Sequence, residues 1–180
     1  MGRRELRNLG GSLAILAVIV AFAYGLPAVN AALPAARQVA TDRPYPLGSG
    51  VSVMPPHGAL VDVTRTGPGS TTFMLGAVRY QLVVTEASGN IDDAAGQLRH
   101  KITAKSGYQV TGTEVPTRTT QGVPGRQGGY TSSGRDGRYA VFVVRGLGVE
   151  VTIAGVDLEL RRALSALTAS VASIAFPDRS

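Results

Sequence analysis

The two histidines are the residues best suited to acid-base or metal chemistry, and their setting favours neither. His57 follows two prolines in a predicted turn, and His100 lies on a predicted helix, about 200° around its axis from the apolar Leu98. They are 43 residues apart, unlike the H-x-x-x-H spacing of a zinc site, and the chain has no cysteine to complete one. We predict a turn histidine and a surface histidine, with no metal and no cofactor.

Serine and carboxylate chemistry are no better supported. The chain has no G-x-S-x-G to place a serine nucleophile on a strained turn. Asp92 and Asp93 are adjacent, and adjacent helical residues point about 100° apart, so both suit the positive N-terminal end of a helix better than paired acid-base work. We predict no catalytic residue and a protein that is not an enzyme. A hydrolase that uses His57 is the least favoured alternative.

One unusual segment, "GVPGRQGGYTSSGRDGR", runs from Gly122 to Arg138 and combines six glycines with three arginines. Backbone N–H groups and guanidinium groups in such a loop could bind an anion, although the Lys-Ser/Thr ending of a P-loop is absent. The plainer interpretation is a flexible hairpin with solvated arginine side chains. If the segment binds a ligand or an acidic partner surface, the sequence indicates Arg126, Tyr130, Arg135 and Arg138.

Charge and composition bear on the partners. The chain carries 18 basic residues, of which 16 are arginine, against 12 acidic residues. Both signs are interspersed, without basic runs or interleaved aromatic residues, so we predict no nucleic-acid partner. The excess of arginine over lysine, with abundant alanine, glycine and valine, is typical of a GC-rich bacterium such as an actinobacterium.

An apolar run near the N-terminus predicts the compartment. No charge occurs from Gly11 until Arg37, and a helix over 9–33 could cross a hydrocarbon core about 30 Å thick. Three arginines within residues 1–8 precede the run, which predicts a cytoplasmic N-terminus and an extracytoplasmic domain. The residues predicted to anchor the chain in the cell membrane are Leu13, Ile15, Leu16, Val18, Ile19, Val20 and Phe22.

A cleaved signal peptide is the alternative for the same run. Gly25 and Pro27 weaken the helix, and the small residues of Val29-Asn30-Ala31 suit cleavage near Ala31, which would give a secreted protein. We favour the anchor because the apolar run continues on both sides of that point. Both alternatives place the folded domain outside the cytoplasm.

Residues 34–50 hold three prolines and two glycines with no apolar period, so we predict an extended linker there. The domain is predicted over 51–177. Two short strands flank Pro55-Pro56, and a long strand alternates apolar with more polar residues from Val78 to Thr85. Further strands are predicted over 108–115, 125–134, 138–144 and 148–155, with a hairpin at Gly146 and Gly148.

Two segments change to a helical period. Ile91, Ala95, Leu98 and Ile102 would share one helical face after an Asn90 cap. Asp157 is predicted to cap a last helix, which ends before Pro177 and whose apolar stripe is Leu160, Leu164, Leu167, Val171 and Ile174. Two heptads are too few for a coiled coil, so the stripe should pack on the sheet. This order of elements predicts an α+β fold, an antiparallel sheet packed by helices.

Several of these features together resemble the PsbP-like fold, which is also seen in LpqN-type envelope proteins of actinobacteria. They are the opening "GVSVMPPHGALV", the helix after the long strand, the glycine-rich hairpin region and the closing "SIAF" of residues 173–176. The resemblance covers about residues 50–176. It implies a non-enzymatic accessory protein that binds partner proteins or small ligands, although a fold alone does not specify a site.

We therefore expect a non-enzymatic binding or scaffold protein of the actinobacterial cell envelope. Its N-terminal helix would contact membrane lipid, and its extracytoplasmic domain would contact another envelope membrane protein. The alternative is a lipid or glycolipid carrier, with an apolar cavity enclosed by the sheet and the last helix.

Overall fold

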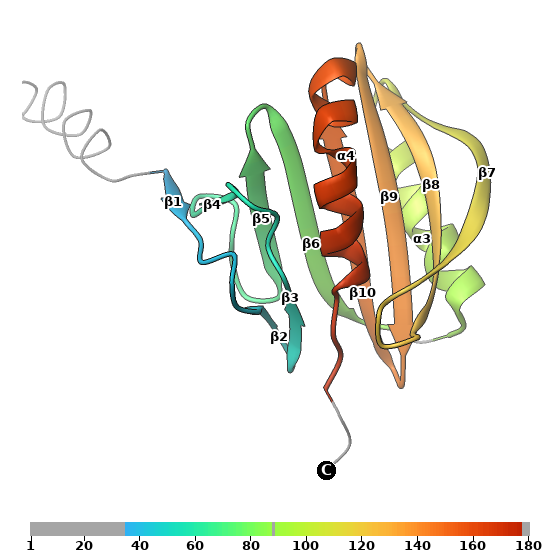
Figure 1. The fold of residues 1–180 in the computed structure, drawn as a ribbon. Coiled ribbons are helices and arrows are strands. Elements are labelled where there is room, and N and C mark those ends of the chain that lie inside the picture. Colours follow the sequence, from blue (N-terminus) through green and yellow to red (C-terminus); the bar gives the residue numbers. More distant parts are fainter. Residues whose placement is uncertain (1–34, 88, 178–180) are drawn as a thin grey trace, which may run out of the picture. The chain divides into compact units, whose positions relative to one another are not determined.

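The structure is a computed structural model that describes residues 35–87 and 89–177 (Figure 1). The predicted cytoplasmic segment 1–8 and the predicted membrane or signal segment 9–33 lie outside the described residues. Within the described ranges, no helix is both long and apolar enough to cross a membrane. The folded domain is a compact unit that begins at Ala36.

A large antiparallel sheet is the centre of the domain. Eight strands form it in the order β1-β4-β5-β6-β10-β9-β8-β7, and β2 and β3 pair separately (Figure 1). The strands are β1 (Ala36–Gln38), β2 (Tyr45–Gly48), β3 (Val51–Val53), β4 (Leu60–Asp62), β5 (Ser70–Leu75), β6 (Val78–Glu86), β7 (Tyr108–Arg118), β8 (Pro124–Ser132), β9 (Arg135–Val144) and β10 (Leu147–Gly155). With two helices against this sheet, the α+β prediction is confirmed.

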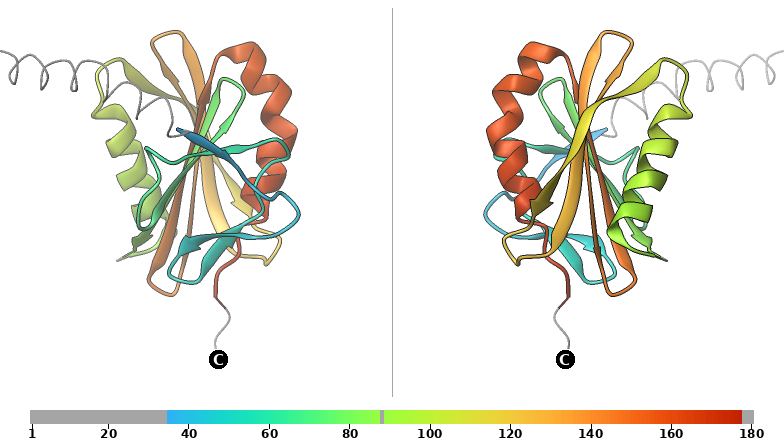
Figure 2. Two further views of the ribbon diagram at one scale, coloured as in Figure 1. Left: turned by 90° about the vertical axis from the view of Figure 1, so that its left-hand side faces the viewer. Right: turned by 90° about the vertical axis from the view of Figure 1, so that its right-hand side faces the viewer.

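Two helices, α3 (Ile91–Thr103) and α4 (Asp157–Ala172), cover opposite faces of the sheet (Figure 2). Because side chains alternate along a strand, β9 supplies both cores. Ala140 and Phe142 belong to the core beneath α4, whereas Tyr139 and Val141 belong to the core beneath α3. The same alternation places the side chains of the glycine-rich segment on one face of the sheet or the other, so only those on the same face can contact one another.

The first helix begins as the sequence predicts. The Asn90 side chain accepts hydrogen bonds from the N–H groups of Asp92 and Asp93, both at 2.9 Å, and the Asp93 carboxylate accepts from the Asn90 N–H at 3.4 Å. This reciprocal capping box satisfies donors that the first turn leaves unpaired. On the sheet side of α3, Ala95, Leu98 and Ile102 are buried.

The last helix has the predicted stripe but a different start. Leu160, Leu167 and Val171 are buried on the face of α4 that packs on the sheet, and Leu164 is half-buried. Asp157 is not the N-cap: it is the first helical residue, and Val156 occupies the cap position without a side-chain hydrogen bond. The Asp157 carboxylate instead accepts a hydrogen bond from Arg161 Nε at 2.8 Å, one helical turn along.

The predicted linker over 34–50 is also corrected. Two of its segments are strands: Arg37 of β1 lies opposite Val61 of β4, and Tyr45 of β2 lies opposite Val53 of β3. Leu47 is only 4% exposed, and the Tyr45 ring packs edge-on against Phe73 with centroids 5.3 Å apart. Prolines at 44 and 46 favour an extended backbone, and hairpin pairing with β3 makes that backbone a strand.

The C-terminal segment joins the start of the domain to α4. Ser52 and Ala175 exchange two backbone hydrogen bonds, at 3.0 and 2.9 Å. The Ser173 hydroxyl accepts from the Met54 N–H at 2.9 Å, and the Ser170 hydroxyl donates to the Met54 carbonyl at 2.6 Å. The "SIAF" segment therefore fixes α4 against the β2–β3 hairpin.

Truncating a buried residue of α4 should reveal how much the domain depends on this packing. Leu167 is fully buried, so Leu167→Ala should lower the free energy of unfolding by about 2–5 kcal/mol. Leu158, on the same helix, is 56% exposed, and Leu158→Ala should change it by less than about 0.5 kcal/mol. Urea unfolding followed by circular dichroism measures both, and equal losses would contradict the packing described for α4.

Candidate binding groove

The glycine-rich segment is a regular strand pair rather than a flexible loop. Residues 124–132 form β8, and the segment continues into β9 after the two-residue turn of Ser133 and Gly134. Both turn residues have positive φ, +34° and +78°, as a tight hairpin turn requires. The predicted strand over 125–134 is present as Pro124–Ser132, and the segment forms a hairpin with exposed Arg135 and Arg138 side chains.

Three glycines of this segment make room for aromatic rings on the neighbouring strand. In the β8–β9 register, Gly125 lies opposite Phe142, Gly128 opposite Tyr139, and Gly137 opposite Tyr130. A Cβ atom at Gly125 or Gly128 would lie 2.5 Å from its ring partner, and one at Gly137 would lie closer still to Tyr130. Rings that cover glycines in this way stiffen a sheet, since the glycines gain packing partners.

Of the four residues that the sequence indicated for ligand binding, Tyr130 and Arg138 line one hollow, and Arg126 and Arg135 lie outside it. Strand alternation places Arg126 on the α3 side of the sheet and Arg138 on the α4 side. Arg135 is exposed beside the β8–β9 turn. Arg126 is already engaged, because its Nη2 atom lies 2.8 Å from the Asp92 carboxylate. Tyr130 is 4% exposed and belongs to the core beneath α3.

Tyr130 supports the sheet from within. Its hydroxyl donates to the Ile153 carbonyl at 3.1 Å, and its ring stacks on Tyr108 with centroids 5.9 Å apart. Burial, assisted by the neighbouring Tyr108, raises the pKa of Tyr130 to about 12. Tyr130 therefore keeps its proton and its hydrogen bond at neutral pH.

Of the four, Arg138 is the exposed side chain that lines a hollow beside α4. This is a groove of about 740 Å³ on the α4 side of the sheet. It exists because α4 packs on β6, β10 and β9 and leaves that face of β8 and β7 uncovered. The residues that line the groove include Thr111, Val115, Gln127, Gly129, Asp136, Arg138, Leu160, Arg161 and Leu164.

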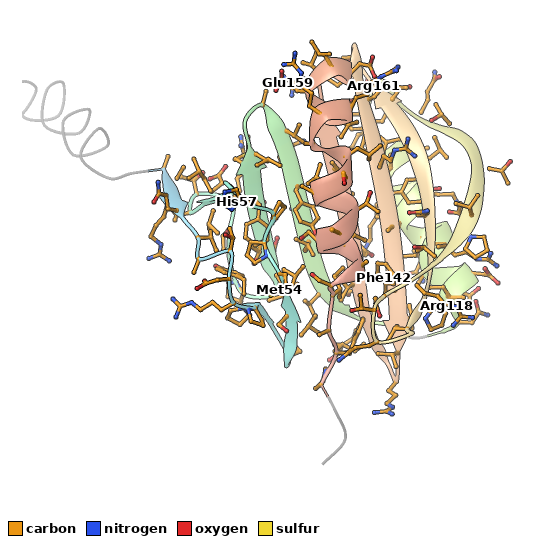
Figure 3. The ribbon with its side chains drawn as sticks, in the orientation of Figure 1. Met54, His57, Arg118, Phe142, Glu159 and Arg161 are labelled. Atoms are coloured by element: carbon orange, nitrogen blue, oxygen red, sulfur yellow. The ribbon has the colours of Figure 1, made fainter. Side chains whose placement is uncertain are left out.

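The groove combines a shallow floor with charged walls. Gly129 adds no side chain to the floor, and a Cβ there would lie 2.8 Å from Thr111 Oγ1. Leu164 and Val115 supply apolar contact, since one is half-buried and the other is 48% exposed. The Arg161 guanidinium at the start of α4 (Figure 3) holds the pKa of Asp157 below its usual range. In the described ranges, Arg138 forms no ion pair.

A second polar cluster lies on the α3 side, and the sequence analysis did not identify it. The Glu114 carboxylate accepts a hydrogen bond from the Tyr139 hydroxyl at 2.8 Å and lies 3.3 Å from Arg99 Nε. Burial and this carboxylate raise the pKa of Tyr139. Glu114 and Tyr139 are 25 residues apart, so only the β7–β8–β9 pairing brings them together.

The two histidines considered for catalysis lie apart from both clusters, whereas Asp92 lines one hollow with Arg99, Glu114 and Tyr139. His57 is exposed in the turn between β3 and β4, with Nδ1 3.5 Å from Thr41 Oγ1, and it is well separated from Arg161 (Figure 3). His100 is exposed on α3, as predicted. Among residues 35–87 and 89–177, no three His, Asp or Glu side chains are grouped so that they could hold a metal ion.

No protein-family model matches the chain, and no curated protein matches its sequence. Solved structures do match. The chain is similar to cyanobacterial PsbP (CyanoP) from Synechocystis sp. PCC 6803, with a TM-score of 0.56 and 13% identity over 78% of this chain and 95% of that one. The fold is PsbP-like. The resemblance noted in the sequence is confirmed at the level of fold.

Two further structures share parts of this PsbP-like arrangement. The protein PA94 of Pseudomonas aeruginosa gives a TM-score of 0.51 and 13% identity over 73% of this chain and 100% of that one. LpqN of Mycobacterium tuberculosis, involved in cell envelope biogenesis, gives 0.45 and 13% over 73% of this chain and 82% of that one. At such identities a likeness concerns the fold alone.

Adding a methyl group to a ring-covered glycine should destabilise the PsbP-like domain. Gly137→Ala would force its Cβ into the Tyr130 ring, so we expect a loss of about 1–3 kcal/mol in the free energy of unfolding. The double change with Tyr130→Ala should lose less than the two single changes summed. Gly96→Ala is the matched control. Gly96 lies within α3, and the nearest atom to a Cβ built there, outside the local helix backbone, is 3.7 Å away. This change should raise the free energy of unfolding by up to about 1 kcal/mol. Urea unfolding measures all four proteins, and a Gly137→Ala protein as stable as the parent would contradict this packing.

The buried tyrosines should make the domain unstable in alkali. Folding raises the pKa of Tyr130 to about 12 and raises those of Tyr80 and Tyr139, whereas unfolded tyrosine ionises near 10. The folded chain thus keeps protons that the unfolded chain loses, so stability holds below about pH 10 and falls as pH rises towards 12. Each tyrosine contributes at most about 1.4 kcal/mol per pH unit. Urea midpoints between about pH 8 and 11.5 test this slope, which Tyr130→Phe should make shallower. An unchanged slope would exclude Tyr130 as a cause.

Proposed function

We propose that this chain is a non-enzymatic, membrane-anchored binding module of the bacterial cell envelope. In this proposal residues 9–33 cross the membrane, and the PsbP-like domain lies on the extracytoplasmic side. The N-terminal arginines and the uncharged run after them support the anchor and its orientation. The arginine-rich composition supports an actinobacterial source.

The groove along α4 is the observation that carries the proposed binding role. Its volume of about 740 Å³ is within the range of small-ligand sites, but charged residues make up much of its wall. Leu164 and Val115 offer apolar contact, and Arg138, which lines the groove with Asp136, forms no ion pair among the described residues. These features suit a short segment of another envelope protein that presents an acidic side chain beside apolar ones.

The structure of the edge strand β7 favours a partner that binds in the groove rather than one that adds a strand to the sheet. β7 is an edge strand, and exposed edges can recruit another strand. Here the pairing of β7 with β8 shifts between Thr111 and Val115, around Gly112 with φ +72°, and Pro116 follows. A bulge and a proline both hinder strand addition, so a partner is better accommodated beside β7, against α4.

The packing of α4 does not favour the alternative of a lipid or glycolipid carrier. Such a carrier would need space between the helix and the sheet, where Leu167 and Ile174 are fully buried. Both belong to one core with Phe73, Tyr80 and Phe142. An acyl chain could enter there only if this core opened.

Charge reversal in the groove provides the test. The full-length protein carrying a photo-crosslinking residue at Val115 would be expressed in its native membrane, and crosslinked proteins would be quantified by mass spectrometry. Arg138→Glu should reduce crosslinking to the partner by at least about tenfold, equivalent to about 1.4 kcal/mol. Arg135→Glu makes the same charge change outside the groove and should leave the crosslink unchanged.

Two results would contradict the proposal. Equal crosslinking by the Arg138→Glu and Arg135→Glu proteins would exclude the groove as the binding surface. Release of the protein from membranes by alkaline carbonate would exclude the transmembrane anchor, because an integral helix resists that extraction.

A further inference from the structure

A second hollow lies at the opposite edge of the sheet from the groove. It has a volume of about 550 Å³ and lies beside β1 and β2. Val61, 2% exposed, is at its base, and Pro44, Tyr45 and Pro46 line its side. The charged side chains that line it are both arginines, Arg37 and Arg43.

The strand register explains why these residues meet. Arg37 lies opposite Val61, and Val61 lies opposite Phe73, so all three are on one face of the sheet. Tyr45 packs edge-on against Phe73 and therefore lies on that face too. Arg43 is in the bend that leads into β2. The hollow thus has an apolar base with two guanidinium groups around it.

The two guanidinium groups are available to a ligand. Both residues are exposed, and within the described part of the chain neither forms an ion pair. Asp42 is adjacent to Arg43 in the chain but is exposed and does not line the hollow. Guanidinium groups bind phosphate oxygens through paired, charge-assisted hydrogen bonds.

We propose that this hollow binds the phosphate of an anionic phospholipid head group. The inference rests on the proposed anchor, since four peptide units tether Arg37 within about 14 Å of Leu33, at the end of the apolar run. A negatively charged membrane surface attracts basic side chains at that range. The apolar surfaces of Pro44, Tyr45 and Pro46 suit the first carbons of the acyl chains of a lipid, which inorganic phosphate lacks.

Calorimetry on the full-length protein in neutral maltoside micelles tests the inference with three probes. They are short-chain phosphatidylglycerol, short-chain phosphatidylcholine and inorganic phosphate. Phosphatidylglycerol should bind, and the double variant Arg37→Ala, Arg43→Ala should bind it about 30-fold more weakly, at about 1 kcal/mol for each arginine. The double variant Arg135→Ala, Arg162→Ala removes the same charge from exposed positions elsewhere and should bind like the parent.

Each contrary result is specific. Equal affinity for phosphatidylcholine, or an equal loss in both double variants, would show that the hollow does not recognise an anionic head group. Inorganic phosphate binding as tightly as phosphatidylglycerol would identify a free-phosphate site and overturn the lipid assignment. Carbonate extraction reports the anchor separately, so an anchored protein without lipid selectivity would refute this inference and leave the proposed function intact.

Discussion

The buried hydroxyl of Ser170 holds together parts of the chain on which the rest of the fold depends. It donates to the Met54 carbonyl at 2.6 Å and lies 3.3 Å from the Tyr80 hydroxyl, which joins α4 to the β3–β4 connection and to the centre of the sheet. If α4 moved, the Ser170 hydroxyl, the Met54 carbonyl and the Tyr80 hydroxyl would each lose a hydrogen bond in an apolar environment. Among the described side chains no buried polar atom lacks a partner, so the helix has a defined position. That position leaves β7 and β8 uncovered and creates the groove.

Glycine has a different role in this sheet from the one that its usual flexibility suggests. Gly125, Gly128 and Gly137 lie beneath aromatic rings, so their missing side chains create close packing instead of mobility. Gly129 has no ring above it and contributes to the floor of the groove. The proposed binding would therefore take place on a packed strand surface, where less entropy is lost than on a loop that must first become ordered.

The sequence predicted elements whose signals are local and missed those that depend on pairing across the chain. The Asn90 cap, the apolar stripes of both helices and the long β6 strand follow from spacing alone. β1 is three residues long and pairs with β4 about 25 positions away, and β2 contains a proline and is four residues long, so neither has a clear apolar period. The candidate site residues are separated for a related reason: proximity in sequence suggested one cluster, whereas strand alternation places Arg126 and Arg138 on opposite faces. A period-two analysis of residues 124–144 would have separated them.

The two arginine-lined hollows are at opposite edges of one sheet, and that separation has a mechanical consequence. β1 and β7 are the edge strands, with six strands between them. At about 4.8 Å for each of the seven spacings, the edges are about 30 Å apart once the twist of the sheet is considered. If the edge strand β1, which holds Arg37, rests on the lipid surface, the groove that holds Arg138 lies away from that surface by the width of the sheet. In that proposed arrangement a partner would reach the groove with a segment outside its own membrane-spanning part, and the sheet would act as a spacer between the bilayer and the groove.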